Sequence, residues 1–179
     1  MKWNVDTNHA AADFAVKHLM ISTVKGQFRK LEGSGETLPD GTLKSVEMTI
    51  DVASIDTNMP QRDDHLRSLD FFDVASHPKL TFRSTKIDQK GNDVSITGEM
   101  TIRGTTQPLT LKGEFTAPTK DPWGNLRAAL SVTGKISRKQ WGLIWNQALE
   151  AGGWAVGDEV KISVELEAVA AAVAELAAV

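Results

Sequence analysis

The feature that most constrains the fold of this chain is a strict alternation of apolar and polar residues over many short segments. Between positions 94 and 102 the even-numbered residues are Val, Ile, Gly, Met and Ile, whereas the odd-numbered ones are Ser, Thr, Glu and Thr. The same two-residue period runs through 46–52, 80–82, 109–115, 126–136 and 160–166. This period is typical of antiparallel strands with one buried and one solvent-exposed face. The alternation therefore predicts an all-β protein.

Short turn sequences separate the alternating segments: Pro39-Asp40-Gly41, Lys90-Gly91-Asn92, Arg103-Gly104-Thr105 and Asp121-Pro122-Trp123-Gly124. Two arrangements hide the apolar faces of about eight strands, namely two packed sheets or a closed barrel, which also leaves no exposed edge. The predicted strands over 92–103 and 106–117 are long, which favours the tilted strands of a barrel. We therefore expect an extended antiparallel barrel of eight strands.

Two internal segments break the alternation. Residues 58–69 predict a short helix at one end of the barrel, because Asn58 is a good N-cap and Gln61 follows it by three positions. Residues 141–154 predict an irregular loop that is rich in large apolar side chains. Such side chains need a hydrophobic neighbour, which either a cavity mouth or a homodimer interface would supply.

The two ends of the chain are less regular. Residues 10–18 contain helix-favouring alanines, but Phe14, Val16 and His18 alternate, so we interpret this segment as a strand followed by one helical turn over 19–24. Residues 168–179 are almost all Ala and Val and predict a short Ala-rich helix. We expect residues 1–167 to form a single barrel domain and 168–179 to form an appended helix or tail.

The composition is that of one globular domain. The chain has 179 residues, with 20 Lys and Arg against 23 Asp and Glu, and no cysteine. The lack of cysteine excludes disulfides, thiolate catalysis and cysteine-ligated metal centres. Basic residues are scattered singly, so there is no stripe for a phosphate backbone and nucleic acid is not an expected partner.

The sequence also bears on location. No window approaches the roughly 20 apolar residues of a membrane helix, so we do not expect an integral membrane protein. The opening Met1-Lys2-Trp3-Asn4 reaches polar residues at once and lacks the apolar core of a signal peptide. We expect a cytoplasmic protein if this start is native, and a periplasmic one if a signal peptide has been removed.

Side-chain size suggests that the barrel is hollow. Gly98, Gly113, Ala128 and Gly134 occupy inward positions of the predicted strands and would leave volume along the wall. The alternative is a solid core, because a glycine inside a strand often marks a bulge or a barrel corner. The predicted helix over 58–69 would cover one barrel mouth in either case.

Several motifs resemble those of the YceI-like family. They are Phe14-x-Val16-x-His18, Gly26-x-Phe28, His65-Leu66-Arg67-Ser68, His77-Pro78-x-Leu80-x-Phe82, Gly98-Glu99-Met100-Thr101-Ile102-Arg103-Gly104 and Ile136-Ser137-Arg138-Lys139-Gln140-Trp141-Gly142. The resemblance covers about residues 2–167 and implies a lipocalin-like barrel. It also implies that the interior binds a polyisoprenoid, an isoprenoid quinone or a fatty-acid-like amphiphile for storage, transport or sequestration.

Candidate ligand-binding residues follow from strand parity and motif position. The expected wall residues are Phe14, Val16, Phe28, Leu66, Leu69, Phe82, Met100, Ile102, Leu111, Leu130, Trp141 and Trp145. His18, His65 and Arg67 are the candidate anchors for a polar head group. Apart from this non-covalent ligand we expect no cofactor.

Four histidines with nearby aspartates raise the alternatives of an enzyme or a metal-binding barrel. No Gly-x-Ser-x-Gly elbow supplies an activated nucleophile, so we expect no catalytic residues. No His-Glu-x-x-His or His-x-His spacing is present, so we assign no metal ligands. A metal-binding or purely structural barrel without a lipid ligand is the competing reading.

Overall fold

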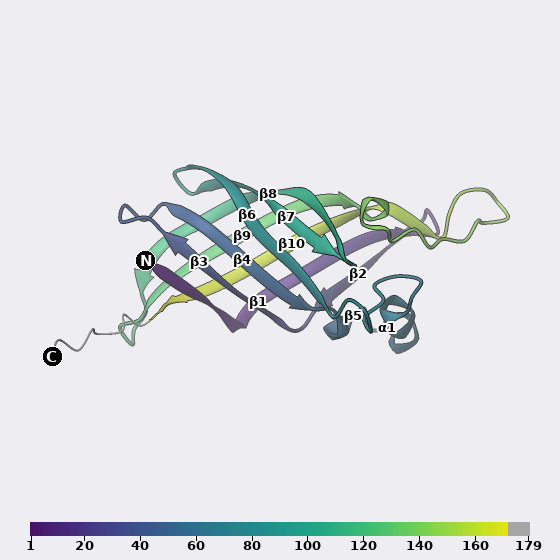
Figure 1. Cartoon of the computed structure of the whole chain (residues 1–179), viewed down its shortest axis with the longest axis horizontal. Coiled ribbons are helices and arrows are strands. Elements are labelled where there is room, and N and C mark those ends of the chain that lie inside the picture. The colour runs from purple at the N-terminus through teal and green to yellow at the C-terminus, as the bar shows by residue number, and fades with distance from the viewer. Residues whose placement is uncertain (172–179) are drawn as a thin grey trace.

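The computed structural model describes residues 1–171 and is an elongated antiparallel barrel (Figure 1). Its strands are β1 (Lys2–His18), β2 (Ser22–Phe28), β3 (Leu31–Thr37), β4 (Leu43–Asp51), β5 (Ile55–Asp56), β6 (Lys79–Lys90), β7 (Asp93–Ile102), β8 (Thr105–Lys120), β9 (Leu126–Ser137) and β10 (Val156–Ala170). One helix, α1 (Pro60–Arg67), and two short 3-10 turns, Val52–Ser54 and Arg138–Trp141, complete the fold. The expected all-β class is confirmed.

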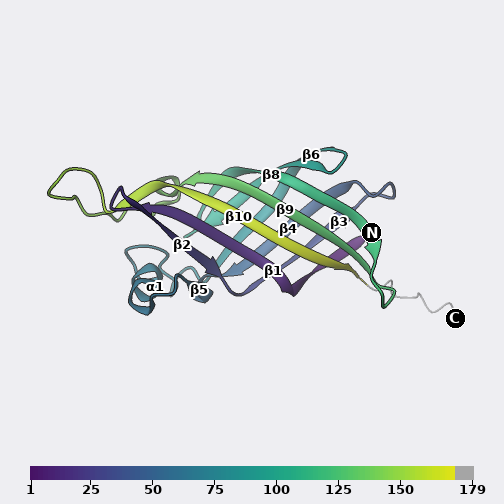
Figure 2. The ribbon, with the colours of Figure 1, turned by 180° about the vertical axis from the view of Figure 1, so that it is seen from behind.

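Eight strands close the barrel. The order runs from β10 through β9, β8, β7, β6, β4 and β3 to β1, and β1 pairs again with β10. The long strand β1 uses its first residues to pair with β3 and its last ones to pair with β2 (Figure 2). The short strand β5 then extends the sheet beyond β2. The expected eight-stranded antiparallel barrel is therefore confirmed, because the pairing of β1 with β10 closes the ring of eight strands.

The inward glycines do not leave empty space, contrary to the expectation from side-chain size. A Cβ atom on Gly98 would lie 2.6 Å from the tip of the Phe82 ring, and one on Gly134 would lie 2.7 Å from Leu111 Cδ2. Large side chains of neighbouring strands thus lie flat over the glycines. The glycines, which have no Cβ atom, allow these side chains to lie close to the wall.

The helix is shorter than predicted. Asn58 does not cap it, because its backbone has a left-handed φ of 60° instead of the extended conformation of a capping residue. The Asn58 N–H is bonded to Asp56 Oδ1 at 2.7 Å. The capping position falls on Met59, and the helix ends at Arg67, where the Ser68 N–H and hydroxyl both bind the carbonyl of His65. The chain therefore turns two residues before the predicted end at Leu69.

Both chain-end predictions change as well. The segment 10–18 is a strand as expected, but no helical turn follows it, because Leu19 and Met20 have positive φ and β2 begins at Ser22. Residues 168–170 belong to β10 and pair with β1, so the predicted C-terminal helix is wrong there. The remainder of that prediction, beyond residue 171, lies outside the described residues.

A bulge in β1 gathers a network of charges outside the barrel. The β1–β10 register breaks between Val5 and Ala10, which frees Asp6 from the ladder. Arg127 on β9 donates to Asp6 at 3.1 Å, to Asp121 at 2.9 Å and to Glu167 at 2.5 Å. One guanidinium thus joins β1, β9, β10 and the turn between β8 and β9.

This network predicts a loss of stability in acid. Hydrogen bonds from His9 and Arg127 lower the pKa of Asp6 from 3.8 to about 2, and bonds from Asn125 and Arg127 do the same for Asp121. Both folded pKa values lie below the unfolded ones, so the contribution is complete above pH 4 and is lost as the pH falls toward 2. The urea midpoint of Asp6→Asn should therefore fall less between about pH 6 and pH 2.5 than that of the wild type.

The matched control for this prediction is Asp93→Asn, at an exposed carboxyl at the start of β7. It should keep the full wild-type dependence of the urea midpoint on pH. An Asp6→Asn protein with the same pH dependence as the wild type would contradict the role given to the Arg127 network.

Candidate functional site

A cavity of about 150 Å³ lies inside the barrel on the side of α1. Its lining comes from β1, β2, β4, β6, β7, β8, β9, β10 and the segment around α1, and it is almost wholly apolar. Because no water-binding partners line most of the wall, such a space favours an apolar occupant over water.

Most of the wall residues expected from strand parity line this cavity. They are Phe14, Val16, Phe28, Leu66, Phe82, Met100, Ile102 and Leu111. Phe28 joins two neighbours by ring contacts, with ring centroids 5.7 Å from Phe14 and 6.0 Å from Phe72. Phe71 and Phe72, from the segment after α1, also line the cavity and close it together with Leu66.

Two expected wall residues lie elsewhere. Leu69 is 70% exposed, because α1 ends at Arg67 and the following turn carries Leu69 away from the barrel. Leu130 faces inward as its parity predicts, but it lines a second, smaller cavity of about 40 Å³ together with Trp3 and Phe115. Parity gave the correct face of β9 for Leu130 but not its height along the barrel axis.

The two expected tryptophans also lie outside the wall of the main cavity. Trp141 is 1% exposed and donates its indole N–H to the Met100 carbonyl at 2.9 Å, so it ties the turn after β9 to β7. Trp145 lies behind the wall, with its ring centroid 5.3 Å from Phe71 and 4.7 Å from His65. Both residues support the cavity rather than line it.

The three candidate head-group anchors have other partners. His65 lies 2.8 Å from Asp70 and packs edge-on against Phe71. Arg67 donates to the carbonyls of Ala53 and Ile55, and so attaches α1 to β5. His18 ends β1 opposite Val156 of β10 and does not line the cavity. The proposed polar contacts of these residues with a ligand are therefore not supported by their positions.

Besides Asp13, which is exposed, the charged residue in the cavity lining is Arg138. Its side chain is buried, and its guanidinium donates to the carbonyls of Leu143, Trp145, Val156 and Gly157. Burial lowers the pKa of the guanidinium, and the nearby Asp158 opposes that effect. The sequence carried a signal for it, because Arg138 continues the inward parity of 126–136. It holds the irregular loop 142–155 against the barrel.

A partition of buried side chains separates the two cavities. Along β9, Ile136 lines the main cavity and Leu130 the smaller one, while Val132 lies between them and is 2% exposed. On β7, Ile96 is 1% exposed and likewise lies beyond Met100. The main cavity is therefore closed at depth and reaches toward the end of the barrel that carries α1 and the loop 142–155.

One group of possible metal ligands occurs among the described residues, on the outer surface. Oxygen or nitrogen atoms of Asp6, His9 and Glu167 lie within 4.8 Å of one another. The guanidinium of Arg127 already binds both carboxylates. Because the positively charged side chain of Arg127 already neutralises these carboxylates, the cluster gives little support to the metal-binding alternative.

Comparison with known proteins assigns the family. The profile of the YceI-like domain matches residues 3–168, which is nearly the whole chain. The chain belongs to the YceI-like domain family. Within the family it is similar to Protein YceI of Escherichia coli, with 37% identity over 145 residues that cover 79% of this chain and 75% of the relative.

Solved structures agree with this assignment. The chain is similar to BcnA of Burkholderia cenocepacia, with a TM-score of 0.74 and 25% identity over 91% of this chain and 98% of the other. For the Campylobacter jejuni YCEI protein the TM-score is 0.75, with 28% identity over 87% and 90%. A polyisoprenoid binding domain from Saccharophagus degradans shares the fold at a TM-score of 0.68 and 14% identity, over 94% and 98%. The resemblance to the YceI-like family is thus confirmed.

The structure also bears on membrane insertion. Within residues 1–171, no helix combines the length and the apolar character that crossing a membrane requires.

Proposed function

We propose that this protein binds the apolar chain of a lipid, such as a polyisoprenoid, an isoprenoid quinone or a fatty acid, inside the barrel and stores or carries it. The observation that supports the proposal most directly is the apolar cavity beneath α1. The shared fold with a polyisoprenoid binding domain supports the same reading. The protein would act by binding rather than by catalysis.

The size of the cavity determines which ligands fit without a change in the protein. A space of about 150 Å³ holds a small aromatic molecule, whereas a long chain needs more room. Met48 and Met100 line the cavity and have three rotatable bonds each, so they can move aside at low cost. Leu66 lies on α1 and Phe72 in the segment after it, so these two lining residues do not belong to the strands of the barrel. We therefore propose that the site widens around its ligand.

Transfer energetics set the expected affinity. Burying ~300 Å² of apolar chain contributes on the order of 7 kcal/mol, before association and ordering costs are subtracted. The result is reversible binding with weak selectivity along the chain, because successive methylene groups look alike. Discrimination would then rest on chain length, which the partition at Ile96 and Val132 limits.

Native mass spectrometry tests the proposal. Protein purified without detergent should carry a non-covalent adduct with the mass of a lipid or quinone, and stripped protein should regain an adduct when it is mixed with a polyprenol. A metal-sized adduct that is removed by chelator, with no uptake of polyprenol, would favour the metal-binding reading. Absence of both adducts would favour a purely structural barrel.

A further inference from the structure

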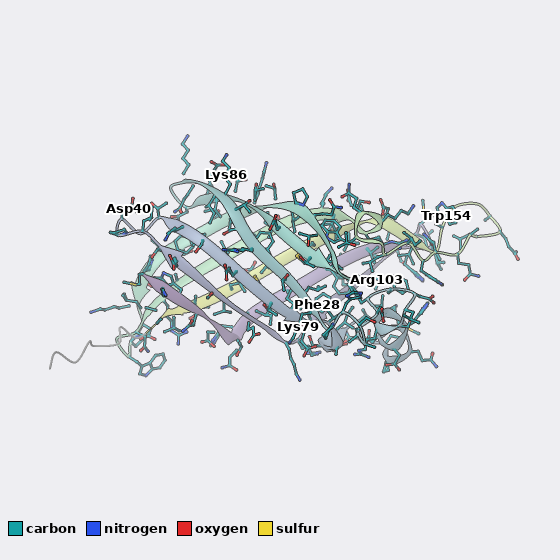
Figure 3. All side chains as sticks on the ribbon, viewed as in Figure 1. Phe28, Asp40, Lys79, Lys86, Arg103 and Trp154 are labelled. Atoms are coloured by element: carbon teal, nitrogen blue, oxygen red, sulfur yellow. The ribbon has the colours of Figure 1, made fainter. Side chains whose placement is uncertain are left out.

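Two loops form an exposed apolar tip at one end of the barrel. In the turn between β1 and β2, Met20 is 63% and Ile21 is 83% exposed, and in the loop after β9 Trp154 is 54% exposed. The loops touch, because the Leu19 N–H binds the Ala155 carbonyl at 2.9 Å and Met20 packs beside Gly153. Figure 3 shows Trp154 on the loop that protrudes at this end of the long axis. We name Met20, Ile21 and Trp154 the apolar tip.

The apolar tip is not part of the lining of the main cavity. More than half of the surface of each of its side chains is exposed, so core packing does not explain them. Large apolar side chains grouped at a protruding end mark a surface that is covered by something else. The remaining question is which kind of partner covers it.

The charge around the apolar tip differs from that of the whole chain. Segments 17–25 and 139–155 contain Lys17, Lys25 and Lys139 against a single carboxylate, Glu150, whereas the chain as a whole has a net charge of −3. Lys17 and Lys25 take part in none of the ion pairs found among residues 1–171. The two loops and the strand ends beside them thus combine apolar side chains with an excess of positive charge, although Lys25 also lies in a surface hollow with Asp13 and Asp56.

The nearest carboxylates after this loop do not cancel that charge. Asp158 accepts hydrogen bonds from the Ser137 hydroxyl and the Lys139 N–H. Glu159 pairs with Lys135 on β9. Both lie on or beside the barrel wall behind the tip, and both already have partners.

We propose that the apolar tip docks this protein on an anionic lipid bilayer. Tryptophan with aliphatic side chains inserts at the level of the lipid headgroups, and nearby lysines bind anionic lipids. A second copy of the chain is a poorer fit, because a stable protein interface needs about 20–30 residues from each side. Docking would turn the end of the barrel near the cavity mouth toward the membrane.

Vesicle sedimentation tests the proposal with the full chain. The wild type should pellet with vesicles of phosphatidylglycerol and phosphatidylcholine, and less with phosphatidylcholine alone. Changing the tip by Met20→Ser, Ile21→Ser and Trp154→Ser should reduce the partition coefficient at least tenfold. Lys17→Glu with Lys25→Glu should abolish the preference for anionic vesicles. Because these side chains are exposed and lie outside the cavity wall, the fold and polyprenol uptake should be unchanged.

An exposed tryptophan at the other end of the barrel provides a matched control. Trp123, in the turn between β8 and β9, is 81% exposed, and Trp123→Ser should bind vesicles as the wild type does. Brominated lipids should quench the fluorescence of the wild type but quench Trp154→Phe much less. Vesicle binding that survives the triple change, or that depends on Trp123, would overturn the proposal. The proposal would also be overturned if the wild type did not bind vesicles but formed a dimer in sedimentation velocity, and if the triple change abolished that dimer.

Discussion

Leu111→Trp is expected to weaken the binding of a long apolar chain by on the order of 50- to 100-fold while the barrel still folds. Leu111 is buried on β8, lies over Gly134 and lines the main cavity. An indole at this position would project into a space of only about 150 Å³. Excluding ~100 Å² of bound chain removes about 2.5 kcal/mol, which corresponds to that loss of affinity. The measurement is a fluorescence titration with cis-parinaric acid.

The neighbouring residue provides the control for the same added volume. Lys112 is exposed on the outer face of β8, so Lys112→Trp adds an indole without changing the cavity. It should bind the probe as the wild type does. Phe82→Trp, on β6 of the same cavity wall, should behave like Leu111→Trp. If both cavity variants fold, as judged by circular dichroism, and bind with wild-type affinity, the ligand does not lie in this cavity.

The alternation predicted the inner wall well because strand parity is a local property. Met100, Ile102 and Leu111 face the interior as soon as β7 and β8 form. Parity cannot tell how far along the axis a residue lies, which is why Leu130 faces the interior as predicted but lines the smaller cavity. Parity also makes no prediction where the chain leaves the sheet. Leu69 is an example, because the direction of its side chain depends on where α1 ends.

Glycine shows a second limit of reasoning from the sequence. Small side chains at positions 98 and 134 suggested empty volume, but volume is shared between strands that pair only in the folded barrel. The Phe82 ring covers Gly98, and Leu111 covers Gly134. The cavity is therefore set by where the large side chains lie, and the positions of the small ones do not locate it.

Arg138→Met is expected to lower the free energy of unfolding by about 4 kcal/mol, the largest stability effect we predict. The change keeps an apolar stem in the wall but leaves the carbonyls of Leu143, Trp145 and Gly157 without their charged donor. The Val156 carbonyl also loses Arg138 but keeps a hydrogen bond from Asn146 Nδ2 at 2.7 Å. A buried acceptor left without its donor costs about 1–3 kcal/mol, and the removed desolvation cost of the guanidinium offsets part of the sum. Thermal unfolding should shift by roughly 10 °C for a chain of this length.

Arg103→Met is the control that tests whether the loss of stability in Arg138→Met comes from burial of the guanidinium or only from the loss of its hydrogen bonds. Arg103 also donates to two carbonyls, those of Leu69 and Gly142, but it is only partly buried, so water can replace it at a cost below about 1 kcal/mol. Hydrogen exchange should also rise across residues 142–155 in Arg138→Met, because the loop would lose its clamp to the barrel. Equal destabilisation by the two changes would show that the buried guanidinium is not what holds this end of the barrel together.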